Sequence, residues 1–203
     1  MILDFSPLKP AERYHTMTQI LIPRPIAWIL SINEDQTYNL APFSYFSGVC
    51  SEPPLISVSI GKKKDGQPKD TRLNILERKR FVIHIPTLED AQQVTDSAKP
   101  FKYGQSETDE LKLELEQLKS FDLPIIKNSA IALQCHYYEC FKVSEVEQAL
   151  ILGKIEKLYA ADDLISESNG RIKYSASKIN PLCRLGGKDY AGLSSTFSID
   201  TSP

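Results

Sequence analysis

The stretch that constrains the fold most runs from Ile131 to Val143, where apolar side chains alternate with other side chains. A period of two is typical of a half-buried strand, because successive side chains of a strand point to opposite faces. The shorter run Leu55–Ile60 shows the same pattern, with Ser57 and Ser59 on the face away from the apolar core. The chain is therefore expected to be built mainly on a sheet.

The remaining elements follow from periodicity and turn residues. Further strands are predicted at 26–32, 38–46, 81–85 and 146–159, helices at 71–80, 87–98 and 107–119, and an irregular lead-in at 1–23 with a short turn near 9–14. Strands outnumber helices and do not alternate strictly with them, which favours a mainly β fold, an antiparallel β-barrel with inserted helices. No linker or repeat divides the chain, so we expect one domain over 1–203 with a core at about 20–190.

Two residues predict local irregularities in the strands. Pro42 cannot donate to a strand ladder and so suggests an edge, a bulge or a kink. Gly153 lies inside a long strand and is a candidate for a bulge or a close approach of backbones.

Composition excludes several functional classes. Apolar residues make up 41% and charged residues 25% of the 203 residues, which is typical of a folded globular chain. A net charge of −2 argues against a nucleic-acid partner, because duplex binding needs a dense basic face. No run is long and apolar enough for a membrane span, and no secretory signal is visible. Together with four scattered cysteines, this predicts a cytoplasmic protein.

The sequence gives little support for a metal site or for a nucleophilic active site. Cys135 and Cys140 are five residues apart on a predicted strand, so they are expected to face opposite sides, and we expect no metal site. His84 lies within a short strand and is expected to be a structural histidine. The sequence has no nucleophile elbow, dinucleotide fingerprint or phosphate-binding P-loop, and we name no catalytic side chain.

Two segments could form a ligand site. Asn39–Phe46 offers extended backbone, small side chains and aromatic rings, which suit a flat and partly polar ring system. Lys69–Asn74 places hydroxyl, amide and cationic groups at a predicted helix start, where free backbone N–H groups attract an anion. A flat ring that carries a phosphate describes a flavin mononucleotide (FMN). The plainer alternative is that these are ordinary turn, core and capping residues.

The same segments resemble the flavin reductase-like family with the FMN-binding split barrel, in the branch that includes flavoredoxin. The resemblance spans about 24 to 190, and it rests on Arg24–Trp28, Asn39–Phe46, Pro53–Leu55, Lys69–Thr71 with Asn74, and Arg184–Gly187 with Tyr190. It implies a closed antiparallel barrel, usually a homodimer, that holds FMN without a covalent bond near the subunit interface.

The resemblance also implies roles for particular residues. Those expected at the isoalloxazine ring and ribityl chain are Asn39, Ala41, Pro42, Phe43 and Ser44; those expected at the phosphate are Ser59, Thr71 and Asn74, with charge from Lys69 or Arg24; Tyr190 is expected to approach from the tail. The implied function is an NAD(P)H-dependent flavin reductase. The alternatives are an FMN electron carrier that serves a redox protein partner, and a scaffold domain without the cofactor.

Overall fold

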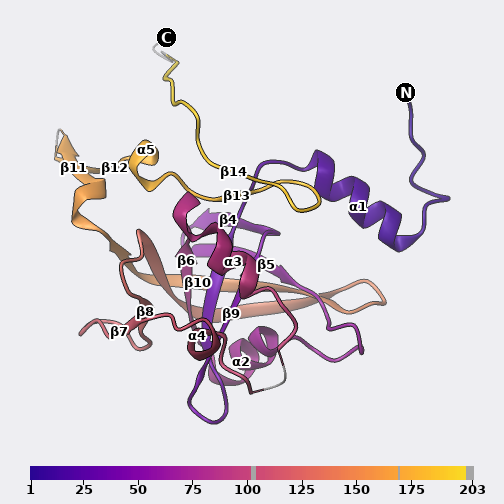
Figure 1. Cartoon of the computed structure of the whole chain (residues 1–203), viewed down its shortest axis with the longest axis horizontal. Helices are drawn as coiled ribbons and strands as arrows, with labels where there is room; N and C mark the ends of the chain where they lie inside the picture. The colour runs from indigo at the N-terminus through magenta and orange to yellow at the C-terminus, as the bar shows by residue number, and fades with distance from the viewer. Residues whose placement is uncertain (102–103, 169, 200–203) are drawn as a thin grey trace.

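The structure is a computed structural model that describes residues 1–101, 104–168 and 170–199 (Figure 1). Its helices are α1 (Pro10–Ile20), α2 (Asp70–Arg78), α3 (Ala91–Asp96), α4 (Glu107–Glu110) and α5 (Ala176–Ile179), with short 3-10 turns η1 (Leu88–Asp90) and η2 (Asp162–Leu164). Its strands are β1 (Arg24–Pro25), β2 (Ala27–Ile32), β3 (Tyr38–Phe43), β4 (Phe46–Ser51), β5 (Pro54–Ile60), β6 (Arg80–Ile85), β7 (Leu115–Glu116), β8 (Ile125–Ile126), β9 (Ile131–Val143), β10 (Gln148–Ala160), β11 (Ile165–Ser168), β12 (Arg171–Tyr174), β13 (Cys183–Arg184) and β14 (Tyr190–Ala191).

Seven antiparallel strands form the main sheet, in the order β3-β2-β6-β9-β10-β5-β4. The two strands at the ends of this order, β3 and β4, follow each other in the chain, with only Ser44 and Tyr45 between them. The N–H of Ser59 on β5 donates to the carbonyl oxygen of Tyr45 at 2.9 Å and ties this link to the sheet. The sheet therefore bends round on itself, and the expected antiparallel barrel is confirmed.

Apolar side chains fill both faces of the sheet. The interior cluster draws on six of the seven strands and includes Ile29, Phe81 and Ile151. The outer cluster includes Trp28 and Leu30 and is covered by α3, the 121–126 segment and Leu182. Because consecutive residues of β2 belong alternately to the two clusters, this strand is buried on both sides, as its nearly continuous apolar run requires.

Several predictions of local structure are confirmed. β9 has the predicted bounds. Pro42 lies in β3, an end strand of the sheet, where its missing N–H costs no ladder hydrogen bond. The pairing of β9 with β10 shifts register at Gly153, and a Cβ atom there would lie 2.5 Å from Cζ of Phe81. Gly153 thus lies opposite a bulge, whose extra residue is Tyr138 of β9, and at a close approach.

The helix predicted over 107–119 is wrong beyond its first turn. α4 ends after Glu110, because Lys112 takes a left-handed conformation with φ of 53°. The N–H groups of Lys112 and Leu113 donate back to the carbonyl oxygens of Asp109 and Thr108, which is the hydrogen-bond pattern of a Schellman stop. The helical stripe was expected from Leu111, Leu115 and Leu118. Leu115 and Leu118 pack instead on the outer cluster from β7 and extended backbone, together with Leu113, and Leu111 is not part of that cluster.

Two further expectations need correction. The lead-in contains α1, with Pro10 at its first position and the N–H of Lys9 bound to the Glu12 carboxylate at 2.7 Å. Cys135 and Cys140 contact the same interior cluster, because an extra residue in β9, Tyr138, shifts the alternation between them. Among the described residues, no group of three or more His, Cys, Asp or Glu side chains could hold a metal ion.

The helices lie on two sides of the barrel. Figure 1 shows α2 and α4 at one side, and α1, β13 and β14 at the opposite side, where the C-terminal segment crosses toward α1. A small hairpin of β11 and β12 lies beside α5 at the far end. In the part of the chain that the structure describes, no helix has the length and apolar character needed to span a bilayer.

Candidate functional site

A buried network of amide and hydroxyl groups joins the β2–β3 hairpin to α2. Asn39 on β3 donates from Nδ2 to Oγ1 of Thr71 at 2.8 Å and lies 3.4 Å from Oγ of Ser31. Asn74, one turn further along α2, donates from Nδ2 to Oδ1 of Asn33 at 2.9 Å and to Ser31 at 3.2 Å. None of the five is more than 5% exposed. The structure therefore brings Asn39, Thr71 and Asn74 together, as the sequence predicted.

The start of α2 leaves backbone donors available. Lys69 is the N-cap residue and makes no side-chain cap, so the first N–H groups of the helix have no intrahelical partner. The ammonium of Lys69 lies 5.3 Å from the centroid of the Phe43 ring, and desolvation lowers its pKa. Asp70 is paired with Lys63 at 2.6 Å. Among the described residues no carboxylate pairs with Lys69, so this corner presents a positive charge and helix N–H groups together.

A carboxylate supports the backbone of β3 next to this corner. Oε2 of Glu107 on α4 accepts a hydrogen bond from the N–H of Leu40 at 2.8 Å. The side chain is 6% exposed, and burial raises its pKa to about 7. The neighbouring Asp70 also raises this pKa, whereas Lys63 and the bond from Leu40 lower it.

Arg24 organises the other end of β3. Its guanidinium donates to the carbonyl oxygens of Thr18 and Leu21 at 2.7 Å each, to that of Leu185 at 2.9 Å, and to Oγ of Ser44 at 3.3 Å. These bonds hold the end of α1 and the C-terminal segment against the link between β3 and β4. The predicted contact of Arg24 with a phosphate remains a prediction, and its present partners are internal.

Tyr45 carries a hydroxyl group that is buried and has no hydrogen-bond partner among the described residues. Its ring meets the ring of Tyr14 edge-on at 6.5 Å, and the guanidinium of Arg24 lies 5.9 Å from its centroid. Burial, followed by the nearby Tyr14, raises its pKa. An unpaired buried donor is costly, so this hydroxyl fits a site that receives a polar ligand.

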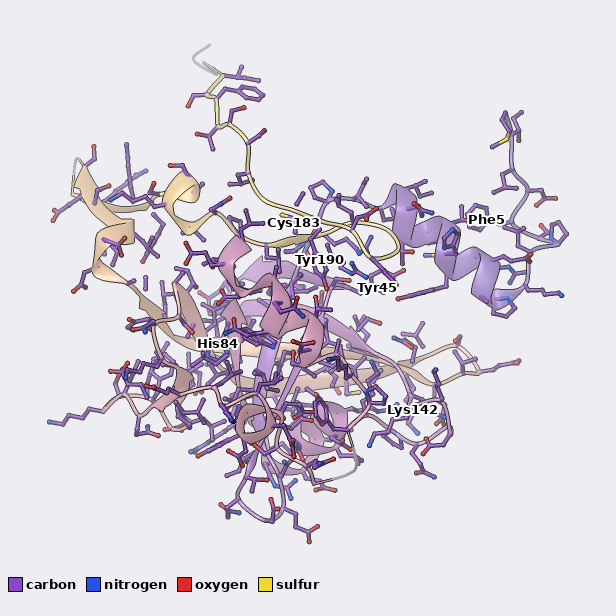
Figure 2. All side chains as sticks on the ribbon, viewed as in Figure 1. Phe5, Tyr45, His84, Lys142, Cys183 and Tyr190 are labelled. Carbon is purple, nitrogen blue, oxygen red and sulfur yellow. The ribbon has the colours of Figure 1, made fainter. Side chains whose placement is uncertain are left out.

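The C-terminal segment closes the same side of the barrel. Figure 2 shows Cys183 and Tyr190 at the strands β13 and β14, on the same side of the barrel as Tyr45. The hydroxyl of Tyr190 accepts from Oγ1 of Thr95 at 3.1 Å, and the guanidinium of Arg184 lies 4.5 Å from the centre of its ring. A Cβ atom on Gly186 would lie 2.7 Å from Gln19 on α1, so only glycine lets this turn approach the helix without displacing that side chain.

The remaining predicted residues line β3 and β5. Ala41 and Pro42 are half-buried at the sheet edge, and Phe43 points into the interior cluster. Ser59 is half-buried, with its Oγ bound by Nε2 of Gln148 at 2.9 Å. Asn39, Thr71 and Asn74 thus meet where β3 contacts α2, whereas Arg24 and Ser44 meet at the other end of β3, and Ser59 belongs to neither group.

The sequence interpretation missed several residues of this region. Tyr45 lies within the predicted segment Asn39–Phe46 but was not among the named site residues. Ser31 and Asn33 lie outside both predicted segments, and Ser31 carries a usable signal as a hydroxyl inside an apolar strand. Glu107 gives no such signal, because its partner Leu40 lies 67 positions away and its own segment predicts a helix. His84 is structural as predicted: its Nε2 accepts from the N–H of Ile126, which leaves Nδ1 to donate to the carbonyl of Trp28, and burial lowers its pKa to about 4.

These features fit a ligand with an anionic end and a flat polar end. Free helix N–H groups and an ammonium suit a phosphate, and extended edge backbone suits the hydrogen-bonding rim of a ring system. The unpaired Tyr45 hydroxyl adds a donor at the opposite end of β3. The donor set is compatible with FMN, and no side-chain constellation for nucleophilic catalysis is assembled among the residues described.

Comparisons with known proteins agree on one family. The model of the family described as "Flavin reductase like domain" matches residues 17–179. A protein of Halalkalibacterium halodurans, described as "Uncharacterized protein BH2278", is 31% identical over 98% of this chain and 96% of its own length. Nitrilotriacetate monooxygenase component B from Bacillus cereus superposes with a TM-score of 0.88, is 28% identical, and covers 98% of each chain. The 2-nitrobenzoate 2-nitroreductase NbaA of Pseudomonas fluorescens gives a TM-score of 0.87 and 27% identity over 100% of this chain and 96% of its own.

Proposed function

The chain belongs to the flavin reductase-like family, and from this premise we propose that it is an FMN-binding, NAD(P)H-dependent flavin reductase. The observation that carries the proposal is the 2.8 Å hydrogen bond from Asn39 to Thr71, because it joins the two segments that a flavin nucleotide requires. One supplies edge backbone for a ring, and the other supplies helix N–H groups for a phosphate. Membership of the family makes FMN the ligand of choice for this combination.

Each end of the nucleotide has candidate partners. The phosphate would be held by the N–H groups at the start of α2, by Lys69 and by Thr71, with Asn74 anchoring the same turn from below. The ring and ribityl chain would lie along Asn39 and Ala41–Ser44. The other predicted contacts, with Arg24, Ser59 and Tyr190, remain part of the proposal.

When bound, FMN would supply the redox chemistry, namely hydride acceptance from a nicotinamide and onward transfer of electrons. The protein's own residues bind and orient the ring, exclude water and tune its potential through hydrogen bonds. Hydride delivery to a flavin requires no side-chain acid or base, so we propose no catalytic side chain.

The names of two similar proteins support the oxidoreductase class. A monooxygenase component and a nitroreductase resemble this chain at 28% and 27% identity over nearly its whole length. Those names describe those proteins, and their substrates are not transferred here. They favour an enzyme over a scaffold domain that has lost its cofactor.

We also propose a homodimer. Large apolar side chains of α1 are exposed, with Tyr14 and Ile20 at 64% each. Further exposed apolar residues lie on the strands β4 and β9, among them Val49, Tyr138 and Phe141. A second copy would cover such surface, since monomers seldom expose large contiguous apolar patches. Size-exclusion chromatography with light scattering measures the mass of the protein in solution. A mass equal to that of one chain would contradict the homodimer.

The decisive test is anaerobic reduction. Purified protein is loaded with FMN, and absorbance at the flavin bands is followed as NADH or NADPH is added. Rapid bleaching supports the reductase. Bleaching only with dithionite or a reduced protein partner would favour the electron carrier, and failure to retain FMN would contradict both the reductase and the carrier.

A Thr71→Ala, Asn74→Ala double variant should weaken FMN retention. Thr87→Ala, which changes a cap residue distant in sequence, is the matched control.

A further inference from the structure

Glu107 occupies the free edge of the strand that would carry the flavin. β3 is an end strand, and Leu40 lies opposite Leu30 of β2. The N–H of Leu40 nevertheless donates away from β2, to Oε2 of Glu107 at 2.8 Å. Two residues further along the same edge, Pro42 has no N–H to offer. Glu107 is therefore the side chain that fixes the outer edge of β3 at this point.

The carboxyl group is held in a rigid setting. α4 is a single turn, started by Ser106, whose Oγ accepts from the N–H of Asp109 at 3.3 Å, and closed by the Schellman stop at Lys112. Ser106, Glu107 and Thr108 are 7%, 6% and 2% exposed. These hydrogen bonds fix the backbone that carries Glu107, and the low exposure of all three residues places its side chain in the protein interior.

The charge state of Glu107 is coupled to the charged groups at the start of α2. The charged groups that act on it are Asp70, the first residue of α2, and Lys63, which is paired with Asp70 at 2.6 Å. Burial is the largest influence and raises the pKa of Glu107 to about 7, so both charge states are populated near neutral pH. The anion proposed for the start of α2 would add a negative charge at the N-terminus of the helix whose first residue, Asp70, already acts on Glu107.

We propose that Glu107 is a positioning residue of the FMN site, which supports the backbone of β3 at Leu40 and takes up a proton when the phosphate occupies the start of α2. The inference rests on the proposed function. A neutral carboxyl group still accepts the Leu40 N–H through its carbonyl oxygen, so the support is kept while the repulsion is removed. A carboxylate would keep the support but oppose the phosphate.

The test is the affinity of the protein for FMN, measured by fluorescence quenching at pH 7.0 and 8.5. This window lies above the second ionisation of a phosphate monoester, near pH 6, so the ligand's charge changes little. The wild-type affinity should fall about three- to tenfold between the two values, since the proton must be supplied from increasingly basic solution. Glu107→Gln keeps an acceptor for Leu40 without the charge and should bind FMN equally well at both.

Three controls distinguish a positioning role of Glu107 from a general loss of FMN binding. Glu110→Gln changes an exposed carboxylate on the same turn and should keep the wild-type pH dependence. Glu107→Ala removes the acceptor and should weaken FMN binding at every pH. Riboflavin lacks the phosphate, so its affinity for the wild type should not change between pH 7.0 and 8.5.

The outcomes distinguish the inference from the function beneath it. If the wild type binds FMN equally well at both pH values, the inference is overturned while the proposed function stands. If riboflavin shows the same pH dependence as FMN, the effect does not act through the phosphate and the inference is again overturned. If the wild type binds no FMN at all, both the inference and the proposed function are contradicted.

Discussion

Thr71 accepts a hydrogen bond from Asn39 at 2.8 Å in a region where both side chains are at most 3% exposed. The two residues are separated by 32 positions, and they come from the two segments that the sequence singled out. A polar pair so deeply buried holds α2 against β3, and it fixes where the first turn of the helix lies relative to the strand.

The contribution of this pair can be measured. Thr71→Val keeps the shape of the side chain but leaves the Asn39 amide without its nearer partner, which should lower the free energy of unfolding by about 1–3 kcal/mol. Thr71→Ser keeps the hydroxyl and should cost clearly less. Urea unfolding of the two variants checks this, and equal stability of Val and Ser variants would show that the hydrogen bond is not what matters.

Gly153 offers a packing test with an internal control. A methyl group added there would lie 2.5 Å from Cζ of Phe81 and 3.1 Å from Cδ1 of Ile56, both in the interior cluster. Gly153→Ala should therefore destabilise the fold by about 1–3 kcal/mol through overpacking. Gly48→Ala, on β4, meets no atom within 4 Å and should be nearly neutral. Comparable melting temperatures for the two variants would contradict the close approach.

The stability of the protein without cofactor should depend on pH in two opposing ways. The pKa of His84 is lowered from 6.5 to about 4, so the unfolded chain binds more protons between these values and stability falls as the pH drops through them. The pKa of Glu107 is raised from 4.5 to about 7, so the folded chain binds more protons there and stability falls as the pH rises. Each effect is on the order of 3 kcal/mol at full extent.

The Glu107→Gln variant separates the pH dependence of stability that His84 causes from that which Glu107 causes. The variant should gain stability steadily from pH 4.5 to 6.5, because only His84 then contributes, whereas the wild type should change less over that range. Above pH 7.5 the variant should be the more stable of the two. Urea unfolding across pH 4.5–8.5 measures both curves, and parallel curves would show that Glu107 titrates normally.

Tyr45→Phe should act in opposite directions on stability and binding. Removing a buried hydroxyl that has no partner among the described residues should leave the cofactor-free protein as stable as before, or more stable by about 1 kcal/mol. If that hydroxyl contacts bound FMN, affinity for FMN should fall severalfold. Thermal unfolding and a fluorescence titration together decide the matter: unchanged affinity would place the hydroxyl outside the site.

Local sequence signals predicted much of the barrel. The alternation over 131–143 predicted β9 with its observed bounds, and Pro42 correctly indicated an irregular or edge strand, because both depend only on chain geometry. The helix start predicted at residue 87 is likewise set by near neighbours, since the Asp90 carboxylate accepts from the Thr87 N–H at 2.7 Å. Such features are set by residues a few positions apart.

The failures arose where tertiary contacts override local preference. Residues 107–119 have strong helix formers, yet their leucines are needed at the outer cluster, and a left-handed Lys112 redirects the chain toward it. α1 was missed because its apolar residues Tyr14, Met17 and Ile20 are exposed in the chain as described and form no buried stripe. An exposed helix gives weak periodicity.

The sequence predicted only part of the candidate site. The segments at Asn39 and Thr71 could be paired because both carry groups that suit one ligand. The bonds of Arg24 to Leu185 and of Glu107 to Leu40 span 161 and 67 positions, and no local pattern announces which edge a charged side chain will meet. Only the closed barrel brings these partners together.

The measurement that tests the central claim most directly is a titration of the purified, cofactor-free protein with FMN, followed by quenching of flavin fluorescence. We expect saturation at one FMN per chain, with weaker binding in Lys69→Gln and no change in Lys173→Gln, which removes an exposed lysine from β12. Absence of saturable binding by the wild type, or equal affinity in both lysine variants, would contradict a flavin phosphate at the start of α2.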